Sequence, residues 1–180
     1  MSATGRWHSL GTQDGRIEIV EYNPDWPRLF EREAAAIRES CHPWVVEVHH
    51  VGSTAVPGLA AKPVLDVMPV AAGPADALEA VSPMTSLGYR YRGENGIKGR
   101  LYFEKAVDGR IVAHAHMFPP GHPAIRTHLA FRDYLRTHPG AARDYERLKR
   151  ELAAKHRNDR EAYTDAKAAF IEGIITAAMG

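Results

Sequence analysis

The chain has 180 residues, 44% of them hydrophobic and 25% charged, which is enough to form one domain with a sizeable core. Its formal net charge of +1 excludes a strongly charged surface that would by itself attract nucleic acid or a membrane. The one cysteine, Cys41, excludes an internal disulfide, no apolar run reaches membrane-spanning length, and the first residues lack a signal-peptide pattern. We therefore expect a soluble, cytoplasmic protein with a flexible tail over residues 1–15 and a single domain over residues 16–180.

The first part of the domain predicts strands on either side of a helix. Residues 16–22 alternate Ile with Glu, which is typical of a strand. Residues 23–40 predict a helix in which Asp25 caps the start and Pro27 lies in the first turn. The β-branched run 44–51 predicts the next strand.

Proline and glycine mark the elements that follow. The apolar run 62–70 predicts a strand, although Pro69, near its end, is unfavourable in a central strand of a sheet. Residues 74–88 predict a helix that ends at Gly88 and that Pro83 can break.

Asp108-Gly109 joins two strand-like runs, residues 100–107 and 110–118, and predicts a β-hairpin. From Pro123 to the end the pattern is helical and predicts three helices. The order of elements implies an α/β (α+β) fold with a mixed sheet, packed helices and a helical C-terminal part.

The segment "HHVGSTAVPGLAAKPVLDVMPV" holds the first candidate site residues. Gly52 allows a sharp turn, after which the hydroxyls of Ser53 and Thr54 can face a phosphate, with Lys62 close by. An ordinary tight turn between two strands is the alternative interpretation. Asp66 interrupts an apolar strand, so it either pairs with a base in the core or lines a cleft.

His114 and His116 lie two apart on the predicted hairpin and share one face of their strand. They form a candidate metal-binding or phosphate-binding pair, or simply two partly exposed imidazoles. A regular two-residue turn would place Lys105 on their face and Glu104 on the other. A one-residue bulge would reverse this, so Glu104 is not chosen as a ligand.

Several segments together resemble the GrpB-like family of uncharacterised proteins, which belongs to the nucleotidyltransferase superfold. They cover nearly the whole chain from Ile17 onward: "EIVEYNPDWPRLFEREAAAI", "HVGSTAVPGLAAKPVLDV", "GYRYR", "GRLYFEK", "HAHMF" and "HLAFRDYLRTHPGAARDYERLKRELAAKHRNDREAYTDAKAAFI".

The resemblance implies that Gly52 and Ser53 grip the phosphates of a nucleoside triphosphate (NTP) while carboxylates hold a divalent metal. Asp66 matches the first carboxylate of the superfamily pattern, but Met68 occupies the position of the second and cannot ligate Mg²⁺ usefully. The strand with His114 and His116 takes the place of the third.

Two arrangements of the centre follow from this departure. Asp66, His114 and His116 could hold a single metal, with Zn²⁺ or Mn²⁺ preferred to Mg²⁺. Alternatively, the imidazoles, Lys62 and Lys105 stabilise phosphate charge with little or no metal.

Four other residues are weighed beside these. His50 could join either arrangement, whereas His49 alternates to the opposite face and is expected to be structural. Lys149 and Lys167 lie in matching family segments and could reach a nucleotide, but the favoured interpretation places them on solvated helix faces.

The first functional hypothesis is a nucleotidyltransferase-type enzyme that transfers a nucleotidyl or other phosphate-activated group from an NTP to a small molecule. In it Asp66, His114 and His116 form the catalytic centre. The absence of a basic tail argues against a nucleic-acid partner. The alternatives are a non-catalytic nucleotide-binding or accessory module, which Met68 favours, and a metal-dependent phosphohydrolase.

Overall fold

The computed structural model describes residues 7, 9–13 and 16–180. Its helices are α2 (Trp26–Ser40), α3 (Asp76–Glu79), α4 (Val81–Ser86), α5 (Pro123–Thr137), α6 (Pro139–Lys155), α7 (Arg160–Asp165) and α8 (Ala168–Met179). Its strands are β1 (Thr12–Gln13), β2 (Val45–Val51), β3 (Leu65–Ala71), β4 (Tyr89–Tyr91), β5 (Leu101–Val107) and β6 (Arg110–Met117), and a short 3-10 helix, η1 (Ser53–Ala55), follows β2.

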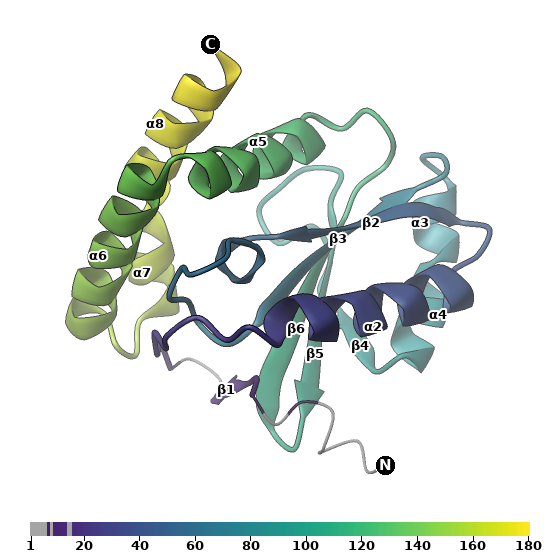
Figure 1. The fold of residues 1–180 in the computed structure, drawn as a ribbon. Coiled ribbons are helices and arrows are strands. Elements are labelled where there is room, and N and C mark those ends of the chain that lie inside the picture. The colour runs from purple at the N-terminus through teal and green to yellow at the C-terminus, as the bar shows by residue number, and fades with distance from the viewer. Residues whose placement is uncertain (1–6, 8, 14–15) are drawn as a thin grey trace.

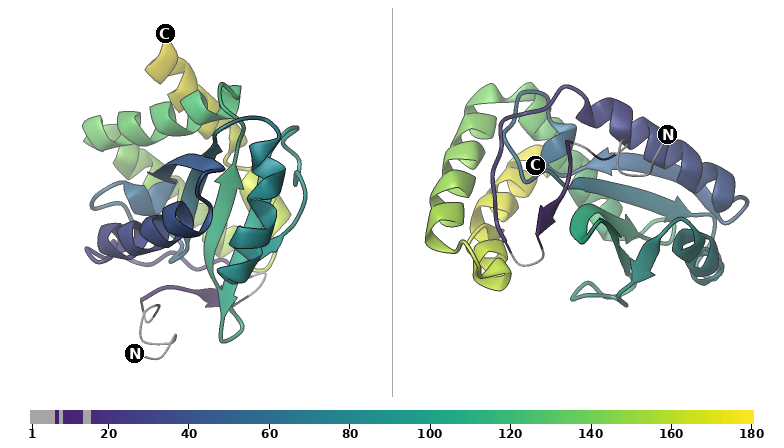
Figure 2. Two further views of the ribbon diagram at one scale, coloured as in Figure 1. Left: turned by 90° about the vertical axis from the view of Figure 1, so that its right-hand side faces the viewer. Right: turned by 90° about the horizontal axis from the view of Figure 1, so that it is seen from below.

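The strands form one mixed sheet in the order β2-β3-β6-β5-β4, with β1 pairing to β6. Strands β3 and β6 run parallel, whereas the other neighbours are antiparallel. Helices α5 to α8 gather beside the sheet on a different side from α2 and α4 (Figures 1 and 2). The predicted α/β (α+β) class, with a mixed sheet, packed helices and a helical C-terminal part, is confirmed. Within the described part of the chain, no helix is both long enough and apolar enough to cross a membrane.

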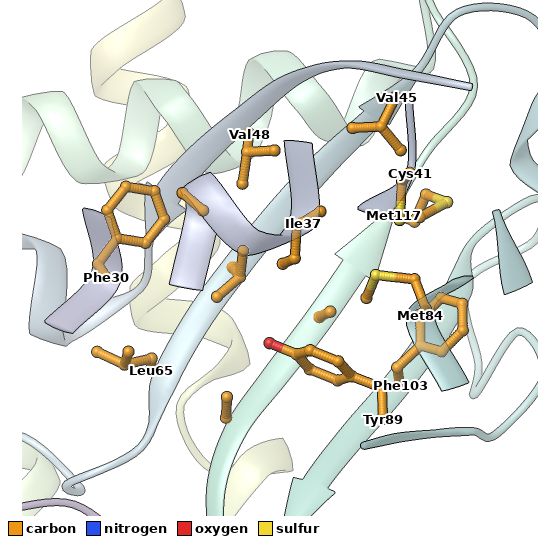
Figure 3. Packing of buried hydrophobic residues seen from close by; sticks show 14 of the residues in the cluster. Phe30, Ile37, Cys41, Val45, Val48, Leu65, Met84, Tyr89, Phe103 and Met117 are labelled. Atoms are coloured by element: carbon orange, nitrogen blue, oxygen red, sulfur yellow. The ribbon is translucent and has the colours of Figure 1, made fainter. Parts of the chain in front are cut away.

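One face of the sheet packs against α2 and α4 and forms the main core (Figure 3). Helix α2 buries Phe30, Ala34 and Ile37, which recur at helical spacing and so form one apolar stripe. Leu65 and Met117 point to the same core from β3 and β6. Alternation along β3 therefore leaves Asp66 and Met68 on the opposite face.

That opposite face is covered by the C-terminal helices. Val51, Met68 and Phe118 pack against α5, and a second cluster joins the loop after β2 to α5, α6 and α8. Arg132 and Arg136 of α5 also donate hydrogen bonds to carbonyl oxygens at and after the end of β2. The sheet and the helices thereby enclose the loop that begins at Gly52.

Several local expectations are wrong near the start of the domain. Residues 16–22 form no continuous strand; one isolated bridge joins Val20 to Ala61. Asp25 occupies the cap position of α2, but its side chain makes no capping hydrogen bond and instead pairs with Arg28 at 3.2 Å. The predicted helix itself is confirmed.

Part of the segment expected as a flexible tail contacts the domain in the described residues. Trp7 and Leu10 are buried in the main core, and Thr12 of β1 pairs with Ile111 of β6. Apolar side chains in this segment therefore extend the core past the predicted domain boundary. The rest of residues 1–15 lies outside the described residues.

Prolines bear on two further elements. Strand β3 is central despite Pro69, which lies beyond the continuous pairing of β3 with β6 that ends at Val67. The helix predicted over residues 74–88 divides into α3 and α4 at Ala80. A proline clashes with the carbonyl four positions before it, which for Pro83 is that of Glu79, so the division falls where Pro83 requires it.

The C-terminal helices follow the prediction with one change. The third predicted helix is divided into α7 and α8, and the Asp159 carboxylate caps α7 by accepting from the Ala162 amide at 3.0 Å. The helical end of the chain is thus folded back against the sheet as separate short and long segments.

Candidate functional site

A cavity of about 640 Å³ lies between the Asp66 face of the sheet and helices α5 to α8. This volume is in the range of small-molecule sites. Its lining combines polar and aromatic side chains of the sheet with basic side chains from helices and loops. The five basic residues are Lys62, Arg100, Lys149, Arg160 and Lys167, against two carboxylates, Asp66 and Asp165.

Gly52 lets the loop after β2 pass directly over Asp66. Its φ of 70° and ψ of −173° are accessible almost only to glycine. A Cβ atom at this position would lie 2.4 Å from the Asp66 Oδ2 atom. The glycine therefore permits both the turn and the position of the carboxylate, and it directs Ser53 into the cavity.

Asp66 lies between the two predicted histidines. The parallel register pairs Asp66 with His114 across β3 and β6. The Asp66 Oδ1 atom is 3.3 Å from His116 Nε2 and 3.5 Å from His114 Nδ1. The structure thus brings the three predicted catalytic residues together at the cavity wall.

Two arginines contact the outer nitrogens of these imidazoles. Arg100 Nη1 lies 3.2 Å from His116 Nδ1, and Arg160 Nη2 lies 3.4 Å from His114 Nε2. A guanidinium can only donate, so each outer nitrogen accepts and each inner nitrogen carries the proton. Both imidazoles therefore donate toward Asp66, in a continuous chain from Arg100 to Arg160.

This chain determines the charge of the centre. Burial would raise the pKa of Asp66, but hydrogen bonds and charge from His114 and His116 outweigh it and hold that pKa well below its usual range. Burial lowers the pKa of His114, and Asp66 opposes this only partly. The carboxylate is therefore ionised, and neutral His114 is favoured beside it.

The expected metal ligands do not fit a divalent cation in this arrangement. In the part of the chain that the structure describes, no three His, Cys, Asp or Glu side chains are grouped as a metal site. The ring nitrogens that face Asp66 carry protons, and a metal ligand must be unprotonated. Moving those protons outward would point them at Arg100 and Arg160.

Lys149 is the least expected member of the site. It is 2% exposed, so the interpretation of a solvated helix face is wrong for this residue. Its Nζ atom donates to Ser53 Oγ at 3.1 Å and to the carbonyl oxygen of Ala60. Burial first, and then the charge of Lys167, lower the pKa of Lys149 to about 7.

Aromatic rings hold the cavity lysines in place of carboxylates. The Nζ atoms of Lys62 and Lys167 lie 5.8 Å and 4.2 Å from the centre of the Tyr163 ring. Burial and neighbouring charge lower the pKa of Lys167 to about 8. Within the described residues, no ion pair joins these two ammonium groups or that of Lys149 to a carboxylate.

Lys105 does not belong to the site. A bulge between Lys105 and Ala106 shifts the hairpin register, so Glu104 pairs opposite His114. Lys105 consequently points to the main core, where its Nζ atom lies 2.6 Å from Glu33 Oε1. The expected regular register, and with it the phosphate-binding role of Lys105, is wrong.

His50 and Thr54 also differ from their predicted role. His50 pairs with Val67 across the sheet and so faces α2, where its ring stacks on Phe30 at 4.4 Å. Its Nε2 atom lies 2.9 Å from Thr54 Oγ1. The Thr54 hydroxyl, predicted to face a phosphate, therefore pairs with His50 instead. His49, expected to be structural, lies 2.7 Å from Glu47 at the surface.

Sequence reasoning missed several residues around the cavity. Arg100 and Arg160 orient the histidines, and His128 of α5 lies 5.7 Å from the His116 ring. One signal was available: Lys149 lies one helical turn after Tyr145, on the apolar stripe of its helix. A lysine at a core position needs a partner or a ligand.

Fold and cavity define the chain as an α+β domain whose mixed sheet carries a buried carboxylate and two imidazoles beneath a cation-rich cavity. The family model described as "GrpB protein" matches residues 16–177, and the chain belongs to this family. The predicted resemblance is thereby confirmed.

The chain is also similar to curated relatives and to solved structures. It is 40% identical over 161 residues to UPF0157 protein YqkA of Bacillus subtilis, covering 87% of this chain and 46% of YqkA. The chain therefore spans about half the length of that relative. It is 28% identical to dephospho-CoA kinase of Mycolicibacterium paratuberculosis, covering 89% of this chain and 46% of the kinase.

Among solved structures, the conserved protein GrpB from Enterococcus faecalis matches with a TM-score of 0.83 and 36% identity, covering 90% of this chain and 97% of that one. The poly(U) polymerase Cid1 bound to MgATP matches with a TM-score of 0.49 and 16% identity, covering 76% of this chain and 44% of Cid1. The likeness to Cid1 is too low to carry an argument about function.

Proposed function

We propose that this chain binds the phosphate groups of an NTP in the cavity and transfers a nucleotidyl or other phosphate-activated group to a small acceptor. The observation that carries the proposal is the set of three cavity lysines, Lys62, Lys149 and Lys167, held by aromatic rings with no ion pair to a carboxylate among the described residues. Lys149 is buried and Lys62 and Lys167 are half-buried, which is costly without counter-charge, and a polyphosphate supplies it.

The arrangement of the lysines supports metal-independent phosphate binding. A charge-assisted hydrogen bond contributes about 1.5–3 kcal/mol to binding. Ser53 Oγ and Lys149 Nζ adjoin in the cavity wall and offer neighbouring partners to one phosphate oxygen. We assign the work of a metal ion, neutralising phosphate charge, to Lys62 and Lys167, while Lys149 contributes a hydrogen-bond donor.

The remainder of the cavity suits an uncharged portion of the ligand. Phe131 of α5 and Ile171 and Ile175 of α8 line it with apolar surface. A nucleobase or a similar flat group can be buried there. The size of the cavity and the net charge of +1 support a small acceptor rather than nucleic acid.

A non-catalytic nucleotide-binding module is the second candidate. Met68 is fully buried at the position where the superfamily pattern has a second carboxylate. Asp66 is held by two imidazole donors, which lower its basicity. Both observations favour a protein that binds a nucleotide but in which Asp66 does not catalyse its turnover.

Binding is tested by titrating ATP, CTP, GTP, UTP and dephospho-CoA with calorimetry, each in EDTA and with Mg²⁺, Mn²⁺ or Zn²⁺. We expect at least one of these ligands to bind in EDTA and to lose affinity at least tenfold in the variant Lys167→Met. The control is Lys155→Met, because Lys155 is exposed and outside the cavity.

Binding that requires a metal, or that is unaffected by Lys167→Met, would refute the phosphate site. Release of pyrophosphate in the presence of a pool of small hydroxyl and amine acceptors then separates the candidates. Turnover supports the transferase, whereas binding without turnover supports the accessory module.

A further inference from the structure

Ser53, Lys149 and Tyr145 form a polar group that phosphate binding alone does not explain. The Ser53 hydroxyl is half-buried at the cavity wall, with Lys149 Nζ 3.1 Å away. Tyr145 lies one turn before Lys149 on α6, and its ring centre is 4.8 Å from the same Nζ atom. The three side chains therefore meet at one point of the cavity wall.

The state of Lys149 makes this contact chemically unusual. A buried lysine is normally paired with a carboxylate, but the partners here are a hydroxyl, a carbonyl and an aromatic ring. With a pKa lowered to about 7, a large fraction of its amine is neutral near pH 7. A neutral amine has a lone pair that can accept the Ser53 proton.

Tyr145 lies beside the same lysine, whose Nζ atom is 4.8 Å from the centre of its ring. Burial raises the pKa of Tyr145 well above its ordinary value. Tyr145 therefore stays protonated and does not compete with Lys149 as a base.

The imidazoles are poorly placed to act as the base in this cavity. Their inner nitrogens donate toward Asp66, and their outer nitrogens accept from Arg100 and Arg160. Neither has a free lone pair that faces the ligand. Lys149 is the basic group that contacts the Ser53 hydroxyl in the cavity wall, with its Nζ atom 3.1 Å from Ser53 Oγ.

We propose that Ser53 is a nucleophile, with Lys149 as its general base, and that it carries the nucleotidyl group as a covalent intermediate. This inference rests on the proposed function and specifies the chemical steps by which the group is transferred. It makes the reaction a double displacement in which the small acceptor reacts second.

In the first step, the Ser53 Oγ atom forms a bond with the α-phosphorus of the NTP. The bond from that phosphorus to the oxygen bridging the β-phosphate breaks, and pyrophosphate leaves with the electron pair. The hydroxyl proton passes to Lys149 Nζ. Lys62 and Lys167 offset the negative charge that develops on the leaving group.

In the second step, an acceptor hydroxyl or amine forms a bond with the same phosphorus and releases its proton to solvent. The bond from phosphorus to Ser53 Oγ breaks, and that oxygen takes its proton back from Lys149. The enzyme is restored, and the products are pyrophosphate and the nucleotidylated acceptor.

The test is to incubate the full chain with each NTP labelled at the α-phosphate, without acceptor, and to map the label by mass spectrometry. We expect one nucleoside monophosphate on Ser53. Ser53→Ala should abolish the label, and Lys149→Arg should slow labelling about 10²- to 10⁴-fold, since arginine keeps the charge but cannot act as a base. Lys155→Met serves as the matched control and should label at the wild-type rate.

Each outcome separates the two proposals. Nucleotide binding without label in the wild type, or label on another residue, would overturn the covalent route and leave the phosphate site intact. Labelling of Lys149→Arg at the wild-type rate would overturn the role of the lysine as base. If Lys149→Arg does not fold, Ser53→Ala still decides, because loss of the label with binding kept within a few-fold supports the nucleophile. An absence of any nucleotide binding would overturn both.

Discussion

Replacing Gly52 with alanine tests the close approach that builds the site. The backbone at Gly52, with φ of 70° and ψ of −173°, costs a non-glycine residue about 1–3 kcal/mol. The new Cβ would also lie 2.4 Å from Asp66 Oδ2 and force the carboxylate away from His116. Such overpacking adds about 1–3 kcal/mol, so Gly52→Ala should destabilise the protein by about 2–6 kcal/mol in all.

Gly58→Ala is the matched control, because Gly58 also has a positive φ, 78°, but no atom lies within 4 Å of its Cβ position. It should cost only about 1–2 kcal/mol. The assay is urea unfolding of both variants beside the wild type, with the His116 ring resonances recorded by NMR. Equal losses of stability with unshifted His116 resonances would refute the claim that the loop rests against Asp66.

Three further predictions follow from the buried charges. Because Lys149 has a pKa of about 7 when folded and 10.5 as its ordinary value, the unfolded state binds more protons between these values, and stability should rise from pH 7 to pH 9 by up to about 1.4 kcal/mol per unit. Urea titrations should show this slope reduced in Lys149→Met, and an unchanged slope would contradict the burial of the charge. Glu33→Gln leaves the buried Lys105 unpaired and should lower the free energy of unfolding by about 3–5 kcal/mol in thermal or urea unfolding. Glu33→Leu combined with Lys105→Met should recover most of this lost stability. A single variant as stable as the wild type would disprove the ion pair. Nitrogen-15 NMR should find His116 protonated on Nε2 and not on Nδ1, and Arg100→Leu should mix the two forms; a proton on Nδ1 in the wild type would break the proposed chain.

Local patterns were sufficient for most of the elements. The apolar spacing of Leu29, Phe30 and Ile37 predicts α2 because those residues meet one surface. Asp108-Gly109 predicts the hairpin because both residues adopt a positive φ, 50° and 74°. These features depend only on neighbours in the chain, which a sequence displays directly.

The register of the hairpin lay beyond that kind of reasoning. The bulge after Lys105 satisfies distant partners: Lys105 reaches Glu33, 72 positions earlier, while Glu104 faces Arg160 at 3.5 Å. No pattern within the hairpin specifies either contact. A one-residue error in register then exchanges the two faces, and with them the assignment of Lys105.

The candidate site could be predicted only in part from the strands. His114 and His116 alternate with apolar residues of one strand, so their shared face follows from the strand period. Asp66 joins them through the pairing of β3 with β6, which the period alone does not specify. Arg100, Arg160 and the lysines come from loops and helices whose approach depends on the packing of the whole domain. Their participation required the three-dimensional structure.

The contact between Ser53 and Lys149 joins positions 96 residues apart, one in the loop after a sheet strand and the other in a C-terminal helix. A ligand held between them would tie those two regions together. Local opening of α6 to α8 away from the sheet would then require the ligand to leave. Occupancy of the cavity would therefore slow amide hydrogen exchange throughout the C-terminal helices, including residues that never touch the ligand.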